Sequence, residues 1–431
     1  MKRLFIVMLV ISILISSTSV GFSLAPEESI SITSESGIVI DAASGDILFE
    51  KNAHKPMYPA STTKVMTAVL TLENANLNDK VIIDKETPFT DGSRIYVKEG
   101  EEFTVEQLLN ALLIQSANDS AVALAKHVSG SVEEFAKLMN KRAKELGALN
   151  TNFTNPNGLP DKNHVTTAYD LSMIAKYAMT IPKFREIVKT EKYQIPITEK
   201  TDEVRYLKNR NRLLWGVGPS NKMEYNGELI DIKYDIVDGI KTGYTAEAQQ
   251  CLVSTAYKNN RRVISVVLKA IKTNVYSDTR KLIDYAFDNF NLIDVVNSGT
   301  ILKTVPVEKG IEENVDLVTQ DSISKIVPNN YNQSHVAHKI EVEQQIVAPI
   351  NKGQVLGKVT YTLNGESIGE TNLIALQSID EKQVYKIIKK IKEPKSINFF
   401  KILIGIALVY ILWRTIVTVR RIRRKRRRWR W

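Results

Sequence analysis

Ser61 and Lys64 lie three residues apart at the start of an apolar stretch that is predicted to be helical. Residues with this spacing share one helix face, so the two side chains can touch. A serine hydroxyl needs an adjacent base to become a nucleophile, and a buried lysine has a lowered pKa and can accept the proton. The positive end of the helix dipole favours the developing alkoxide. Ser-x-x-Lys is common in surface turns, so the pair indicates catalysis only when other catalytic motifs accompany it.

Two later stretches supply the other parts that acyl transfer from an amide requires. Ser116 and Asn118 lie in a predicted helix–helix loop, where a hydroxyl can relay a proton and a carboxamide can hold a substrate amide. Lys241, Thr242 and Gly243 lie on a predicted strand. Lys241 and Thr242 can bind a substrate carboxylate there, and the glycine lets the substrate backbone approach closely.

An oxyanion hole completes the set. Its donors would be the backbone N–H groups of Ser61 and of Tyr244, the residue after Gly243, each worth about 3 kcal/mol. Singly, each motif has an ordinary explanation, because Ser116 and Asn118 could cap a helix and Lys-Thr-Gly could be a turn. Together and in this order, they match the mechanics of penicillin-interacting serine enzymes.

The elements around the motifs predict an α+β first domain, with an antiparallel sheet flanked by helices and an all-helical cluster beside it. Thr104 is a plausible N-cap, and Ser131 with Glu134 forms a predicted capping box. Apolar patterning predicts strand hairpins over 37–41 with 45–50 and 250–257 with 262–269, and helices over 104–114, 120–127, 167–179 and 277–289.

From about residue 297 the helix signals stop, and short β-rich runs predict a small all-β domain without a catalytic constellation. A basic amphipathic helix around 384–391 suits a membrane surface or packing on that domain. The last apolar core, 402–413, has twelve residues, short of the ~20 that a spanning helix needs. Snorkelling by Lys401 and Arg414 would extend it, so spanning is favoured over lying flat.

The charge is concentrated at the ends of the chain. The formal net charge is +10, but the last twelve residues carry nine Lys or Arg and no acid, and Lys2 and Arg3 add two more. The body is therefore close to neutral, which argues against nucleic acid, and the tail fits the cytoplasmic side of a membrane. Residues 1–25 have the layout of a secretory signal, so the body is exported whether the segment is cleaved or retained.

The sequence offers no metal or cofactor site. Its single cysteine, Cys251, excludes an intramolecular disulfide and lies in an apolar run typical of a buried core thiol. His335 and His338 have no carboxylate or third ligand nearby. We therefore expect no cofactor and no metal.

With these motifs, the chain resembles a known family, the serine-type D-alanyl-D-alanine carboxypeptidases, or low-molecular-weight penicillin-binding proteins. Besides the three motifs, the resemblance rests on residues 58–61, 155–159, 237–240 and 348–354. It implies a β-lactamase/transpeptidase-like catalytic domain. The resulting domain map is a signal peptide (1–25), catalytic domain (26–292), β-rich domain (293–380), amphipathic linker helix (381–397), transmembrane anchor (398–419) and basic cytoplasmic tail (420–431).

The resemblance also implies substrates and roles. The substrate would be a peptidoglycan stem peptide ending in D-Ala-D-Ala, with β-lactams as covalent inhibitors and membrane lipid around the anchor. The implied roles are Ser61 as the acylated nucleophile, Lys64 as base, Ser116 and Asn118 in proton transfer and positioning, Lys241 and Thr242 on the terminal carboxylate, and Tyr244 N–H in the oxyanion hole. One departure is Gln249, where the family usually has glycine.

Three alternatives remain. A class A β-lactamase would need a glutamate to activate the deacylating water, and residues 150–158 contain no acid. A D,D-endopeptidase would perform the same chemistry on a larger substrate. A non-catalytic wall-binding scaffold is disfavoured because it would not need all six polar motif residues.

Overall fold

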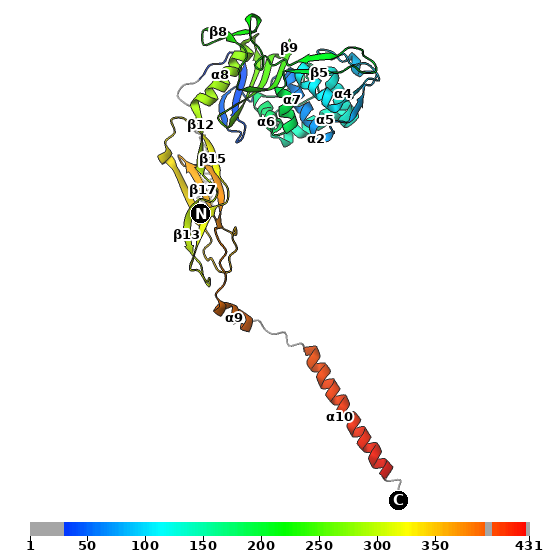
Figure 1. Ribbon diagram of the computed structural model, residues 1–431, viewed down its shortest axis with the longest axis vertical. Helices are drawn as coiled ribbons and strands as arrows, with labels where there is room; N and C mark the ends of the chain where they lie inside the picture. Colours follow the sequence, from blue (N-terminus) through cyan, green and yellow to red (C-terminus); the bar gives the residue numbers. More distant parts are fainter. Residues whose placement is uncertain (1–29, 393–398, 428–431) are drawn as a thin grey trace, which may run out of the picture. The chain divides into compact units, whose positions relative to one another are not determined.

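The computed structural model describes residues 30–392 and 399–427, and the predicted signal peptide lies outside them (Figure 1). The chain forms two compact units. The first contains the residues up to 295 and those from 324 to 335, and the second contains 296–323 and the residues from 336 onward. Each unit is built on its own five-stranded sheet.

The first unit is organised around an antiparallel sheet with the strand order β2-β1-β11-β10-β9. Both predicted hairpins are confirmed, one as β1 with β2 and the other as β10 with β11. The strands of this sheet are β1 (Ser36–Asp41), β2 (Ile47–Lys51), β9 (Val237–Thr245), β10 (Gln249–Lys258) and β11 (Arg261–Ala270). Three small hairpins lie outside it: β3 (Lys80–Ile82) with β4 (Glu102–Thr104), β5 (Lys192–Ile195) with β6 (Arg205–Lys208), and β7 (Lys222–Tyr225) with β8 (Glu228–Asp231).

Helices cover both faces of this sheet (Figure 1). The helix α8 (Asn274–Asn289) packs Leu282 and Ile283 against Val39 and Leu252 on one face. The other face supports the helical cluster. Its members are α2 (Lys64–Asn74), α3 (Val105–Asn110), α4 (Asn118–Ser129), α5 (Val132–Glu145), α6 (Ala168–Ala178) and α7 (Pro182–Lys189).

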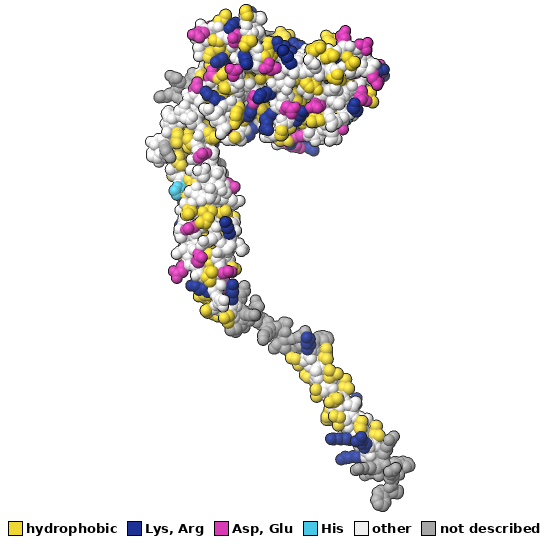
Figure 2. All heavy atoms as spheres, viewed as in Figure 1, with side chains coloured by type: hydrophobic (Ala, Val, Ile, Leu, Met, Phe, Trp, Pro, Cys, Tyr) yellow, Lys and Arg dark blue, Asp and Glu magenta, His cyan; other side chains and the backbone are white. Residues whose placement is uncertain are grey.

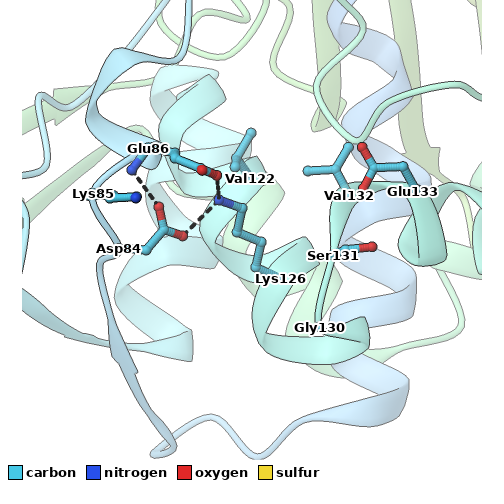
Figure 3. A pocket seen from close by; sticks show the side chains of 9 residues that line it. All are labelled: Asp84, Lys85, Glu86, Val122, Lys126, Gly130, Ser131, Val132 and Glu133. Carbon is cyan, nitrogen blue, oxygen red and sulfur yellow. Dashed lines mark hydrogen bonds and ion pairs between the residues drawn. The ribbon is translucent and has the colours of Figure 1, made fainter.

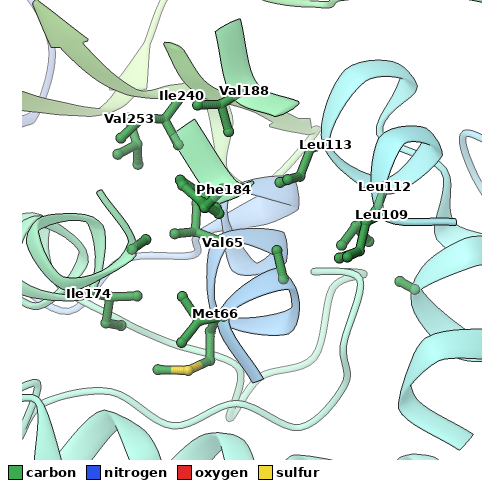
Figure 4. Close-up of a cluster of buried hydrophobic side chains, with 14 of the residues drawn as sticks. Val65, Met66, Leu109, Leu112, Leu113, Ile174, Phe184, Val188, Ile240 and Val253 are labelled. Atoms are coloured by element: carbon green, nitrogen blue, oxygen red, sulfur yellow. The ribbon is translucent and has the colours of Figure 1, made fainter. Parts of the chain in front are cut away.

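The centre of this cluster is α2, in which every residue from Lys64 to Thr71 is buried. Val65 and Met66 lie among apolar side chains of α7, α6 and the sheet (Figure 4). A helix that is apolar on every side is stable only when it is buried on every side. Ser61 therefore lies three residues before a helix whose first eight residues are all buried.

The helix termini agree with the sequence in part. Thr104 and Gln107 form the reciprocal capping box of α3. At α5, Ser131 accepts a hydrogen bond from the Glu134 N–H, but the Glu134 carboxylate pairs with Lys137 instead of returning to the cap, so that predicted box is only half formed. The predicted 104–114 helix finishes as one π-helical turn, Ala111–Gln115.

The second unit carries a sheet with the order β13-β14-β18-β17-β16. Its longest strands are joined by Asn364 and Gly365, whose φ values of 53° and 86° form a tight turn. The strands are β13 (Ile301–Pro306), β14 (Asn314–Thr319), β16 (Val336–Val342), β17 (Val355–Leu363) and β18 (Glu366–Ala375).

A further strand pair joins β12 (Phe290–Val296) to β15 (Ile323–Pro328). Ile326 of β15 is buried in the same apolar cluster as Phe290, in the core of the first unit. The sequence pattern alone placed 293–380 in one continuous domain, whereas 324–335 packs with the first unit.

Two helices end the described chain, α9 (Gln383–Lys392) and α10 (Phe399–Arg427). Val384 and Ile387 of α9 are 64% and 56% exposed, so they do not pack on the β-rich domain. Within α10, Lys401–Arg424 is long and apolar enough to cross a membrane. Its apolar side chains are followed by a run of basic ones (Figure 2).

Candidate active site

Ser61 lies in a 3₁₀ turn, Ala60–Thr63, and Lys64 is the first residue of α2. The Lys64 Nζ lies 2.9 Å from Ser61 Oγ, 2.6 Å from Asn118 Oδ1 and 2.6 Å from the Asn157 carbonyl oxygen. Complete burial, reinforced by the positive charge of Lys241, lowers the pKa of Lys64 well below its ordinary value. The predicted contact between the serine and the lysine is therefore present.

The three partners of Lys64 define what its amine can do. A neutral amine has two N–H groups and one lone pair. Asn118 Oδ1 and the Asn157 carbonyl can only accept hydrogen bonds, so they take both N–H groups. The lone pair is left for the third partner, the Ser61 hydroxyl, which suits Lys64 as a general base.

The Asn157 carbonyl was not among the site residues predicted from sequence. Residues 155–158 bring it to Lys64, and they pass so close to the 3₁₀ turn that a Cβ at Gly158 would lie 1.9 Å from the Ala60 oxygen. Gly158 also has a φ of 84°, which only glycine adopts freely. His164 supports the loop, because Nδ1 accepts from Thr154 N–H and Nε2 lies 2.9 Å from Thr63 Oγ1. Burial lowers the pKa of His164 to about 4, so it is neutral.

Asn118 begins α4 and joins Lys64 to the loop of residues 91–97. Its Nδ2 donates to the Asp91 carbonyl at 2.6 Å and its backbone N–H donates to that of Ser93 at 2.7 Å. Ser116 is buried, with a left-handed φ of 65° that ends the π-helical turn. Within residues 30–392 and 399–427, its hydroxyl has no hydrogen-bond partner, so the structure brings together Ser61, Lys64 and Asn118 but leaves Ser116 unattached.

The strand β9 carries the third motif. Lys241 is buried, its Nζ donates to the Thr242 carbonyl, and its pKa falls to about 7 because of burial and then the charge of Arg210. Arg210, also missed in the sequence, places a second cation near the motif. A Cβ on Gly243 would lie 3.0 Å from Ser61 N, in front of the expected oxyanion donor. Tyr244 is 60% exposed.

The segment that precedes the 91–97 loop is tied to α4 at a surface cavity of about 560 Å³. Lys126 binds the carboxylates of Asp84 and Glu86 at this cavity (Figure 3). Although burial opposes ionisation, bonds from Lys126 and two backbone N–H groups lower the pKa of Asp84 to about 2. None of the predicted site residues lines this cavity.

The family model of D-alanyl-D-alanine carboxypeptidases matches residues 23–272, and that of the penicillin-binding protein 5 C-terminal domain matches 290–381. The chain belongs to the D-alanyl-D-alanine carboxypeptidase family. The carboxypeptidase DacF of Bacillus subtilis is 34% identical, over 83% of this chain and 88% of its own length. DacC of Escherichia coli is 32% identical, over 82% and 86%. Penicillin-binding protein 5 from Haemophilus influenzae has a TM-score of 0.65 at 30% identity, over 83% of this chain and 100% of its own.

These relationships confirm the resemblance and the predicted fold class. The protein is a serine D-Ala-D-Ala carboxypeptidase, a hydrolase of the bacterial cell wall with a β-lactam-binding fold. Cys251 is a buried residue of β10 that pairs with Gly243 of β9. Burial raises the pKa of its thiol to about 12, which confirms the interpretation of Cys251 as a core thiol.

The structure explains the departure at Gln249. This residue has a φ of 54°, where glycine is favoured, and its side-chain amide donates to the Ala246 carbonyl. We expect Gln249→Gly to raise the carboxypeptidase's free energy of unfolding by roughly 0.5–1 kcal/mol, because relief of the left-handed strain exceeds the added freedom of the unfolded chain. Denaturant unfolding would measure it. Gln249→Ala, which keeps the strain and loses the amide bond, is the control, and an equal gain there would contradict the explanation.

Proposed function

We propose that this carboxypeptidase removes the terminal D-alanine of peptidoglycan stem peptides through an acyl-enzyme on Ser61. The observation that carries the proposal is the buried Lys64 amine, whose two acceptor partners leave its lone pair for the Ser61 hydroxyl. Lys64 accepts the hydroxyl proton while Ser61 Oγ attacks the carbonyl carbon of the penultimate D-alanine.

The tetrahedral intermediate then collapses. The amide C–N bond breaks, the leaving nitrogen takes a proton from the Lys64 ammonium, and D-alanine departs. At this step the Ser116 hydroxyl relays the proton and the Asn118 carboxamide holds the substrate amide. A water molecule hydrolyses the ester, with its proton passing back through Lys64, and frees Ser61 and a peptide shortened by one residue. Each proton accepted by Lys64 is returned, so the cycle needs no cofactor.

The cations beside β9 select for a substrate with a free carboxyl terminus. Lys241 and Thr242 bind the carboxylate of the terminal D-alanine, and Arg210 adds long-range attraction. Gly243 lets β9 pass close to the nucleophile turn, because a Cβ there would lie only 3.0 Å from Ser61 N. In this proposal the backbone N–H groups of Ser61 and Tyr244 stabilise the reacting oxygen. A carboxylate bound at Lys241 keeps that lysine charged, and the burial of Lys64 is the main cause of its lowered pKa.

Penicillin acylates Ser61 in the same way, because its lactam amide and carboxylate match the D-Ala-D-Ala terminus. The segment 155–158 next to Lys64 presents a carbonyl and no carboxylate. Without an acid to activate water, we expect the penicilloyl ester to be hydrolysed slowly, which separates this enzyme from a class A β-lactamase.

The test is mass spectrometry of the full-length protein after incubation with penicillin, followed by peptide mapping. The expected result is one penicilloyl group on the peptide that carries Ser61, together with D-alanine release in a parallel assay. An adduct on another peptide would overturn the assignment of Ser61. If a folded sample formed no penicilloyl adduct and released no D-alanine, the alternative of a non-catalytic wall-binding scaffold would be favoured.

We further propose that the catalytic domain (26–292) lies outside the cell, exported by the signal in residues 1–25 and held by an anchor in 398–419. Support comes from the exposed apolar surface of α10 and from the basic residues 420–431 that follow its apolar part. Along the chain, the β-rich domain (293–380) and the linker (381–397) lie between the catalytic domain and this anchor. Truncation after residue 397 should release the enzyme from alkali-washed membranes, and retention would refute this anchor.

A further inference from the structure

The loop of residues 91–97 carries a cation and an aromatic ring that the proposed mechanism does not use. The Arg94 guanidinium lies 5.2 Å from the centroid of the Tyr96 ring, and Tyr96 is 70% exposed. Arg94 makes one side-chain hydrogen bond, from Nη1 to the Pro88 carbonyl at 3.2 Å, and no ion pair among the residues that the structure describes. Its positive charge therefore has no counter-ion there, and its Nε is buried without a hydrogen-bond partner.

The loop is held rigidly from two sides. Buried Asp119 accepts hydrogen bonds from the N–H groups of Ile95 and Val97, at 3.0 and 3.3 Å. Arg205 of β6 donates to the carbonyls of Ile95 and Tyr96, at 2.9 and 3.3 Å. These bonds fix the Tyr96 backbone at a φ of 60°, a conformation rare for a bulky side chain and typical of functional positions.

The same loop borders the nucleophile. Asn118 contacts both Lys64 and the Asp91 carbonyl, each at 2.6 Å, so one side chain separates the base from the loop. Gly92 permits this approach, because a Cβ there would lie 2.5 Å from Asn118 Nδ2. The loop therefore lies two hydrogen bonds from the Lys64 amine, on the side of the site that Asn118 forms.

We propose that Arg94, held over Tyr96, binds a carboxylate on the side chain of the residue that precedes D-Ala-D-Ala. The proposal rests on the proposed function, because it assumes that the penultimate carbonyl lies at Ser61. A planar guanidinium pairs with a carboxylate through two parallel hydrogen bonds, and the ring below keeps its plane in place. The preferred substrates are therefore stem peptides with an acidic group at that side chain, over those with an amine or a carboxamide.

The test compares two peptides with the full-length enzyme. Both end in D-Ala-D-Ala, and they differ only in a carboxylate or a carboxamide at the end of the preceding side chain. We expect wild-type kcat/KM to be about tenfold higher for the carboxylate peptide. Arg94→Gln should remove this preference through a higher KM for the carboxylate peptide, with the carboxamide peptide unchanged.

Matched variants separate binding from a structural role. Arg94→Lys keeps the charge without the paired geometry and should keep part of the preference. Tyr96→Phe keeps the ring and should keep all of it, whereas Tyr96→Ala should lose part. An equal loss on both peptides in Arg94→Gln, or no preference in the wild type, would overturn the subsite.

Penicillin acylation of the same samples distinguishes the two proposals. An intact Ser61 adduct without a carboxylate preference refutes the subsite and leaves the proposed function standing. A wild type that forms no adduct and releases no D-alanine refutes both.

Discussion

Ser61→Ala is expected to lower the rate of D-alanine release by about 10³-fold or more and to eliminate the penicilloyl adduct. The Ser61 hydroxyl is the group placed to receive the acyl chain, since it lies 2.9 Å from the Lys64 amine. Release is measured by detection of free D-alanine, and the adduct by the mass of the intact protein.

Ser44→Ala is a suitable control for Ser61→Ala. Ser44 is an exposed serine in the turn between β1 and β2, and its hydroxyl bonds to Asp41 and Asp46, neither of which is a predicted site residue. Its loss should leave both readouts unchanged. Residual adduct formation by folded Ser61→Ala would show that another group is the nucleophile.

Lys64→Met should slow penicillin acylation by about 10³-fold, because it keeps the volume of the side chain and removes the base. The variant leaves Asn118 Oδ1 and the Asn157 carbonyl without their donor, so a loss of stability of about 1–3 kcal/mol should accompany it. Stopped-flow acylation and thermal unfolding measure the two effects. Lys241→Met is the matched control, and it should weaken penicillin binding more than it slows acylation at saturation.

The pH dependence gives an independent test of the role of Lys64. Because its pKa is lowered, the neutral, base-competent amine predominates above that lowered value and is lost only as the pH falls below it. At saturating penicillin, the acylation rate should therefore reach its plateau at a pH well below 10.5, the ordinary pKa of a lysine, and fall only below the lowered pKa of Lys64. A tenfold rise per pH unit that continued up to pH 10.5 would instead indicate a lysine with an ordinary pKa.

Much of this site was predictable because its parts are side chains in short local patterns. The Ser61 and Lys64 contact follows from helical spacing, and the position of the third motif on a strand follows from the apolar pattern of 237–245. The strand hairpins and the Thr104 cap were predictable for the same reason, since each depends on residues close together in the chain.

The parts that sequence reasoning missed depend on distant contacts. The Asn157 oxygen belongs to the backbone and lies 93 residues from Lys64, so no residue type marks it, although the Gly158 that admits it is a visible signal. Arg210 is one of many basic residues and is distinguished only by its proximity to Lys241. The short helix α7 is amphipathic and begins at Pro182, and it was overlooked between stronger patterns.

The burial of Lys64–Thr71 in α2 makes the activity of the enzyme depend on the global stability of its fold. A segment enclosed on every side cannot open locally, so the amide hydrogens of these residues should exchange with solvent only when the whole first unit unfolds. Lys64 is part of that helix, and Ser61 directly precedes it. Heat should therefore leave no folded but inactive population, and catalytic activity and core protection should disappear at the same temperature.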